Sequence, residues 1–290
     1  MSGDVIITVT LNAALHVSYR AEAAPAANGI TPVSRPVYRA GGRGVTVARV
    51  LREFGHDVLA AGLAGGAAGE LIGLDLARAG VPAEFTRIRG ESRRLFTFAP
   101  AGLTYGEPGP YITTEELGRF AGDYRTLLAS AAAVVLSGSL PDGLPPDMYA
   151  TLVRYATEAG VPVILDAGGE ELLLAVRNRP ALVIADSAEA QAGHALLRLG
   201  AGAAVVRGGG TVEVVTQSGR WTASAAHSGE AAVLDRGALV AGLVPGELLA
   251  WSWPDRLRHS VALATGVTPD GDVDPRAYET LLETVTITAD

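Results

Sequence analysis

Three glycines and an arginine, Gly41-Gly42-Arg43-Gly44, form a segment whose residue types suit the binding of an anion. Apolar residues recur at helical spacing after it, so the glycines are expected at the start of a helix. Glycine lets a ligand approach the main chain, and the N-terminus of a helix attracts anions because its first N–H groups lack partners within the helix. The same pattern is typical of a tight turn before a helix, so both interpretations stay open.

The titratable residues exclude several other chemistries. All 23 basic residues are arginine, and the sequence has no lysine and no cysteine. A Walker-type phosphate loop, a Schiff base, a thiolate metal site and a cysteine nucleophile are therefore excluded. No nucleophile elbow is present, and the histidines do not have metal-ligand spacing, so no metal site is expected. The histidines are His16, His56, His194, His227 and His259.

The charge of the chain indicates the class of partner. A net charge of −8 lacks the basic surface that nucleic acid requires, so we expect a small-molecule ligand and no nucleic acid. The acidic start, Met1-Ser2-Gly3-Asp4, does not resemble a signal peptide, and no apolar run approaches the roughly 20 residues that span a bilayer. We expect a cytoplasmic protein without a membrane partner.

Short β-branched runs alternate with stretches of helical periodicity along the chain. This alternation predicts an α/β fold, with a doubly wound, mostly parallel sheet flanked by helices in a single domain over residues 1–290. The expected strands are Val5–Leu11, Asp57–Leu63, Ala132–Ser137, Val161–Asp166, Ala181–Ala185, Ala203–Val206 and Val212–Thr216. The expected helices are Arg43–Glu53, Gly69–Ala79, Thr114–Ala129, Pro146–Ala159, Gly169–Val176 and Ala238–Leu249.

Two stretches interrupt this alternation, His16–Ala40 and Phe85–Ala99. Both are expected to contribute β-strands to a small lid over the ligand crevice, which in such sheets lies at the carboxyl ends of the strands. Exposed strands of such a lid could pair between two chains, so a homodimer through the lid is expected. Asp166 ends an expected strand at the crevice, where it could face a ligand or act as a turn residue.

Several segments, in this order along the chain, resemble those of the 1-phosphofructokinase branch of the ribokinase/PfkB carbohydrate kinases. The resemblance extends from Val5 to about Val285. It implies a ribokinase-like fold with a small β-sheet lid, and ATP- and Mg²⁺-dependent phosphoryl transfer to a sugar phosphate. The segments are Thr10-Leu11-Asn12-Ala13-Ala14-Leu15-His16, the glycine cluster, Ala61-Gly62-Leu63-Ala64-Gly65-Gly66, Gly90-Glu91-Ser92-Arg93, Gly106-Glu107-Pro108-Gly109-Pro110, Ser137-Gly138-Ser139-Leu140-Pro141-Asp142-Gly143 and Leu165-Asp166.

The resemblance assigns a set of residues to sugar-phosphate binding. They are Asn12, His16, Gly41, Gly42, Arg43, Thr46, Arg93 and Ser139. Three of them depart from the family pattern, which has aspartate at His16, lysine at Arg43 and asparagine at Thr46. Arginine can still hold a phosphate with two parallel hydrogen bonds. We therefore expect phosphate recognition to persist and recognition of the sugar hydroxyls to differ.

The resemblance assigns Asp186, Glu189, Arg207 and Gly209 to nucleotide binding, and this half of the site departs further from the family pattern. The family motif Lys-Pro-Asn-x-x-Glu corresponds to residues 184–189, which keep only Glu189, the residue that helps to organise Mg²⁺ through water. The family motif Ser-Leu-Gly corresponds to residues 207–209. Arg207 there is either ordinary variation in a loop or a contact for an anionic ligand, and the sequence leaves both open.

The catalytic motif Gly-Ala-Gly-Asp corresponds to Leu234-Asp235-Arg236-Gly237, so the position of the family's general base is Gly237. Asp235 could replace the base only if the loop were rebuilt, since two residues span up to about 7 Å and proton transfer needs contact at about 3 Å. Arg236 could neutralise that carboxylate or steady a phosphate. Alternatively, Asp235 is the N-cap of the following helix.

Three functions remain open. The chain could be a sugar-phosphate kinase like its relatives, or a kinase that uses Asp235 with a changed donor or acceptor. It could also be a catalytically silent relative that binds a sugar phosphate or small anion as a sensor or regulatory subunit. A carboxylate near the lid-side pocket above Gly237 would favour an enzyme. A nucleotide pocket filled by apolar or arginine side chains would favour the silent relative.

Overall fold

The computed structural model describes residues 5–21, 29–99, 102–186, 193–208, 210–225, 234–268 and 272–289, and the statements below concern these residues. Its strands are β1 (Val5–Thr10), β2 (Ala14–Arg20), β3 (Val37–Gly41), β4 (Val58–Gly65), β5 (Ala83–Ile88), β6 (Arg93–Ala99), β7 (Leu103–Gly106), β8 (Ala131–Ser137), β9 (Val163–Asp166), β10 (Leu182–Asp186), β11 (Ala203–Gly208), β12 (Thr211–Thr216), β13 (Arg220–Ala225) and β14 (Val285–Ala289). Its helices are α1 (Arg43–Glu53), α2 (Gly66–Arg78), α3 (Thr114–Leu128), α4 (Met148–Glu158), α5 (Gly169–Ala175), the 3₁₀ turn η1 (Val176–Asn178), α6 (Gly193–Leu199), α7 (Arg236–Leu248), α8 (Trp253–Thr265) and α9 (Pro275–Thr284).

Within these residues, a large sheet has the strand order β14-β13-β12-β11-β10-β9-β8-β1-β4-β5. Neighbouring strands from β5 through β11 are parallel, and β11 to β14 are antiparallel. β1 is buried over nearly all its length because its β-branched residues pack against helices on both faces of the sheet. The sheet therefore confirms the expected mostly parallel, doubly wound architecture.

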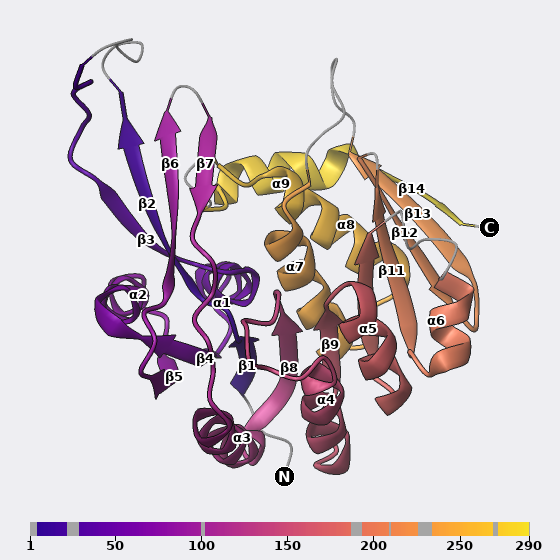
Figure 1. Ribbon diagram of the computed structural model, residues 1–290. Coiled ribbons are helices and arrows are strands. Elements are labelled where there is room, and N and C mark those ends of the chain that lie inside the picture. The colour runs from indigo at the N-terminus through magenta and orange to yellow at the C-terminus, as the bar shows by residue number, and fades with distance from the viewer. Residues whose placement is uncertain are drawn as a thin grey trace.

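Helices cover both faces of this sheet (Figure 1). One apolar cluster joins the sheet to α1, α2, α7 and α8 through residues such as Val47, Ile72 and Leu239. A second cluster joins the other face to α3, α4, α5 and α6 through residues such as Phe120 and Tyr149. These two cores fix the helices relative to the strand ends, where the candidate site lies. No helix within the described ranges is long and apolar enough to cross a membrane.

A second sheet has the order β3-β2-β6-β7 and rises beside the large sheet (Figure 1). We call it the small sheet. Its strands come from the two stretches that interrupt the alternation in the sequence and from β7, which the sequence pattern did not indicate. Phe85 was expected in this ribbon, but it lies in β5, which pairs in parallel with β4 at the edge of the large sheet. An alternating pattern of apolar and polar residues identifies a strand, but it does not show which sheet the strand joins.

Candidate functional site

The carboxyl ends of three adjacent strands bring a serine and two aspartates together. β8 ends at Ser137, β9 at Asp166 and β10 at Asp186, and the strand register places Ser137 and Ile184 opposite Asp166 on its two sides. The Asp166 side chain is completely buried, and its Oδ2 accepts a hydrogen bond from Ser137 Oγ at 2.5 Å. Parallel strands thus place a buried carboxylate at the edge where such sheets bind ligands.

Arg236, the first residue of α7, binds both aspartates. Its Nε donates to Asp166 Oδ1 at 2.5 Å, its Nη1 forms an ion pair with Asp186 Oδ2, and its Nη2 donates to the Ile184 carbonyl at 3.4 Å. The side chain is only 13% exposed. Burial opposes its charge, yet the two carboxylates raise the pKa of Arg236 above its ordinary value. Every nitrogen of this guanidinium therefore has an internal acceptor.

Two more arginines flank this contact. Arg43 Nη1 lies 3.2 Å from Asp166 Oδ1, and Arg207 Nη2 lies 3.0 Å from Asp186 Oδ1. Burial alone would raise the pKa of Asp186. The positive charges of Arg236 and Arg207 have the larger effect, and they lower this pKa below its ordinary value. We call the five residues Arg43, Asp166, Asp186, Arg207 and Arg236 the arginine–aspartate network. Three guanidinium groups face two carboxylates in it, so the network carries an excess of positive charge.

The N-terminus of α7 is capped by the chain itself. Asp235 Oδ1 accepts a hydrogen bond from the backbone N–H of Ala238 at 2.8 Å, so the N-cap interpretation of Asp235 is confirmed. Arg236 turns toward Asp166 and Asp186 instead of neutralising Asp235. A carboxylate thus lies at the helix end that the sequence pattern predicts to stabilise a transferred phosphoryl group.

Gly237, the expected position of the family's base, packs against α1. A Cβ built on Gly237 would lie 2.6 Å from Thr46 Cγ2 and 2.7 Å from Thr46 Cβ. Thr46 and Gly237 are both departures from the family pattern, and the structure makes them neighbours. The space into which a side chain at position 237 would extend is therefore filled by Thr46.

Asn12, Arg93 and Ser139 lie together on the side of the small sheet. Asn12 Nδ2 donates to Ser139 Oγ at 3.2 Å, and Arg93 Nε donates to the Asn12 carbonyl at 3.3 Å. Asn12 is buried, and its Oδ1 has no partner within the described residues. Because buried polar atoms are normally hydrogen-bonded, this acceptor is suited to a donor from a ligand.

His16 lies against the glycine cluster. A Cβ on Gly41 would be 2.2 Å from His16 Cδ2, so only glycine leaves room for the imidazole. Burial first, then the charges of Arg93 and Arg39, lowers the pKa of His16, which is consequently neutral at pH 7. Gly42 has a φ of 112° and is the N-cap of α1, so the expected helix start at the glycine cluster is confirmed.

The carboxylates of Asp166 and Asp186 do not fit the Mg²⁺ that the family pattern implies. Mg²⁺ needs free oxygen ligands, whereas the oxygens of Asp166 and Asp186 face arginines. Within the described ranges, no group of three or more suitable side chains could hold a metal ion. Two residues of the expected nucleotide site, Glu189 and Gly209, lie outside the described residues.

Sequence reasoning missed how Asp166 and Ser137 contribute to the site. Asp166 ends a strand, as expected, but its role depends on Arg236 and Arg43, which come from other elements. Ser137 belongs to a recognised segment, yet its hydrogen bond to Asp166 follows only from the pairing of β8 with β9. A polar residue at the end of each neighbouring strand is the signal that could have indicated this cluster.

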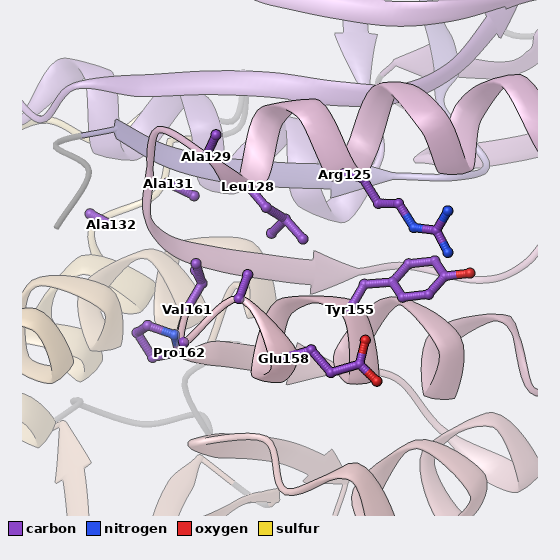
Figure 2. Close-up of a pocket in the computed structure, with 11 residues that line it drawn as sticks. Arg125, Leu128, Ala129, Ala131, Ala132, Tyr155, Glu158, Val161 and Pro162 are labelled. Atoms are coloured by element: carbon purple, nitrogen blue, oxygen red, sulfur yellow. The ribbon is translucent and has the colours of Figure 1, made fainter. Parts of the chain in front are cut away.

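A separate hollow lies at the amino ends of the strands, opposite the ends that carry the candidate site, and Figure 2 shows the residues that line it. Its volume is about 680 Å³, and it opens where α3 and α4 end and β8 and β9 begin. Arg125 lies over the ring of Tyr155 there, 3.9 Å from its centre. No residue of the arginine–aspartate network lines this hollow. This hollow is therefore separate from the candidate site at the carboxyl ends of the strands.

Known proteins share both the sequence pattern and the fold. The model of the pfkB family of carbohydrate kinases matches residues 5–221. A structure described as a possible 1-phosphofructokinase from Thermotoga maritima superposes with a TM-score of 0.87 at 22% identity, with 99% of each chain covered. A putative phosphofructokinase from Staphylococcus aureus gives a TM-score of 0.83 at 22% identity, covering 98% of this chain and 99% of that chain.

Phosphofructokinase-2 from Escherichia coli, solved in complex with fructose-6-phosphate, also has this fold. Its TM-score is 0.83 at 21% identity, with 98% of this chain and 99% of that chain covered. At these identities the structures are evidence of the fold alone. They confirm the expected ribokinase-like architecture of a large parallel sheet with a second, small sheet.

Proposed function

Because the chain belongs to the PfkB family of carbohydrate kinases, we propose that it binds a phosphorylated sugar without transferring a phosphoryl group to it from ATP. The observation that carries this proposal is the guanidinium of Arg236, which lies between Asp166 and Asp186 at the ends of β9 and β10. The sequence analysis associates a nucleotide pocket filled by arginine side chains with a catalytically silent relative of the kinases.

Anion binding is supported by Arg93. Its guanidinium is half-buried, and burial lowers the pKa of Arg93 from its ordinary value. In the described part of the chain its hydrogen bond goes to the neutral Asn12 carbonyl, and no carboxylate pairs with it. A desolvated arginine without a counter-ion attracts phosphate strongly because its planar guanidinium can form two parallel hydrogen bonds with it. Asn12 Oδ1, which has no partner among the residues that the structure describes, would accept a hydrogen bond from the sugar.

The absence of phosphoryl transfer is supported at three points of the site. The base position is Gly237, the helix end beside it is capped by Asp235, and the carboxylates of Asp166 and Asp186 are engaged by arginines. Loss of general-base catalysis alone costs a factor of about 10²–10⁴ in rate. The negative charge of the Asp235 cap at the N-terminus of α7 would also disfavour a transferred phosphoryl group there. Together these changes would strongly reduce the rate of phosphoryl transfer.

The test is a thermal-shift titration combined with an assay of ADP formation. Fructose 1-phosphate, fructose 6-phosphate, inorganic phosphate and ATP with Mg²⁺ are each added to the full chain. We expect a sugar phosphate to raise Tm, by mass action on the folded state, and ATP with Mg²⁺ to leave it unchanged. Sugar-dependent ADP formation would overturn the proposal, and so would the lack of stabilisation by any sugar phosphate.

Two variants of adjacent residues on β6 make the binding test specific. Arg93→Gln removes the guanidinium beside Asn12, and we expect it to abolish the Tm shift caused by the sugar phosphate. Arg94→Gln is the matched control, because Arg94 pairs with Glu107 at 2.8 Å on the exposed side of the strand. It should keep the shift. Equal losses in both variants would contradict the assignment of Arg93.

A second candidate is a kinase that uses Asp235 as its base, and it is favoured by the position of that carboxylate at the start of α7. Asp235→Asn separates the two functions, since asparagine is as good an N-cap as aspartate but cannot accept a proton. Sugar-dependent ADP formation in the unchanged chain, lost in Asp235→Asn at unchanged Tm, would establish the kinase.

We also propose that two chains pair through the small sheet. Its outer strands, β3 and β7, carry exposed apolar side chains, among them Val37 at 65%, Leu103 at 55% and Tyr105 at 60% exposure. Unpaired strand edges with apolar residues favour association with another chain. The molar mass in solution, measured by analytical ultracentrifugation, tests this proposal, and a monomer at all concentrations would refute it.

A further inference from the structure

The described site and the Mg²⁺ chemistry of the family disagree, and the disagreement centres on one side chain. We propose that Arg236 takes the place of a divalent cation: tethered to α7, its guanidinium bridges the carboxylates of Asp166 and Asp186, so that this crevice needs no metal ion. This inference rests on the proposed function only for the position of the ligand crevice.

The position of Asp166 creates the need for a cation. Its side chain is 0% exposed, and burial of an unpaired carboxylate is strongly unfavourable. Asp186 ends the neighbouring strand, which adds a second negative charge at the same edge of the sheet. Two adjacent carboxylates repel each other unless a cation lies between them. Positive charge at the ends of β9 and β10 therefore stabilises these two carboxylates in this chain.

Arg236 meets this need in the manner of a bridging ion. Two of its nitrogens contact one carboxylate each, and the third contacts the main chain of β10 at Ile184. Its backbone is fixed, because α7 begins at Arg236 and the next residue, Gly237, packs against Thr46 of α1. A metal ion would have to displace a tethered and pre-positioned group. Displacement of such a group is unfavourable because the tether keeps its local concentration high.

The surrounding charges also disfavour a metal ion. Arg43 lies 3.2 Å from Asp166, and Arg207 lies 3.0 Å from Asp186, so each carboxylate already has a second guanidinium. A divalent cation added to this excess of positive charge would be repelled, and Mg²⁺ would also lose the free carboxylate oxygens that it prefers. The crevice is thus organised before any ligand arrives. Binding of a sugar phosphate should be the same in EDTA as in excess Mg²⁺.

The experiment measures Mn²⁺ binding to the full chain by the loss of the electron paramagnetic resonance signal of free Mn²⁺. We expect the unchanged chain to bind none at this site. Arg236→Ala should bind Mn²⁺ at least about tenfold more tightly, because one positive charge between the carboxylates is removed. The gain should disappear in the double variant Arg236→Ala/Asp166→Asn. Arg236→Gln provides a second test if the alanine variant does not fold.

Arg256→Ala is the matched control. Arg256 Nη1 lies 2.5 Å from Glu247 in a similarly buried ion pair, 12% exposed, away from the network, and its loss should not create Mn²⁺ binding. Stoichiometric Mn²⁺ binding by the unchanged chain that is lost in Asp166→Asn would overturn the inference. So would folded Arg236 variants that bind no more Mn²⁺ than Arg256→Ala.

The two proposals fail in different ways. If the unchanged chain binds Mn²⁺ and also binds a sugar phosphate without forming ADP, the cation inference fails and the proposed function stands. If Arg236→Ala gains the Mn²⁺ site but no sugar phosphate raises Tm, the cation inference stands and the proposed function fails.

Discussion

Substitution of Gly237 tests whether the position of the missing base is truly filled. In Gly237→Ala, the new Cβ would lie 2.6 Å from Thr46 Cγ2 and 2.7 Å from Thr46 Cβ, so α1 and α7 must separate slightly. Overpacking of this kind costs about 1–3 kcal/mol, whereas alanine gains up to about 1 kcal/mol over glycine in a helix. In a Thr46→Gly background the clash disappears and only the gain remains. The coupling energy between the two positions should therefore be about 1–3 kcal/mol.

The assay is urea denaturation of the two single variants, the double variant and the unchanged chain, followed by far-UV circular dichroism. Gly118→Ala in α3 is the matched control, because a Cβ at Gly118 meets nothing within 4 Å and should only stabilise. If Gly237→Ala stabilises as much as Gly118→Ala, or the coupling energy is below about 0.5 kcal/mol, the reasoning is refuted. The confirmed coupling would mean that Gly237→Asp can restore a carboxylate only when Thr46 is also replaced.

Three further outcomes are expected. Asp235→Ala should lower the free energy of unfolding by about 1 kcal/mol and Asp235→Asn should leave it nearly unchanged, since the lost interaction is the cap of α7; equal effects in urea denaturation would contradict this. Burial, with His56 nearby, lowers the pKa of His259 to about 4, so the unfolded chain takes up this proton first as pH falls. Stability should therefore fall by up to about 3 kcal/mol between about pH 6.5 and pH 4, and His259→Gln should flatten this dependence, as urea midpoints across that range would reveal. Tyr105→Lys, on the exposed edge of the small sheet, should lower the molar mass in ultracentrifugation to that of a monomer, and an unchanged dimer would exclude this face.

Much of the fold could be predicted because local sequence determines it. The β-branched run at the N-terminus forms the central strand β1, and the helix expected over Thr114–Ala129 is α3, which starts at a capping box between Thr113 and Glu116. Sequence patterns do not predict a strand that forms only because it pairs with a neighbouring strand. Phe85 lies in the large sheet, and β13 and β14 were not expected, because antiparallel edge strands become strands only by pairing.

The sequence by itself determined which groups are available to the candidate site: no lysine, glycine at the expected base position, and aspartates at 166, 186 and 235. These facts follow from residue identity and the order of motifs. Only the tertiary structure decided what the groups do. Arg236 is separated by 70 residues from Asp166 and by 50 from Asp186, and it reaches both because β9 and β10 are adjacent in the sheet. Thr46 fills the space at Gly237 because α1 packs on α7, and packing between distant segments is set by the shared core rather than by either segment alone.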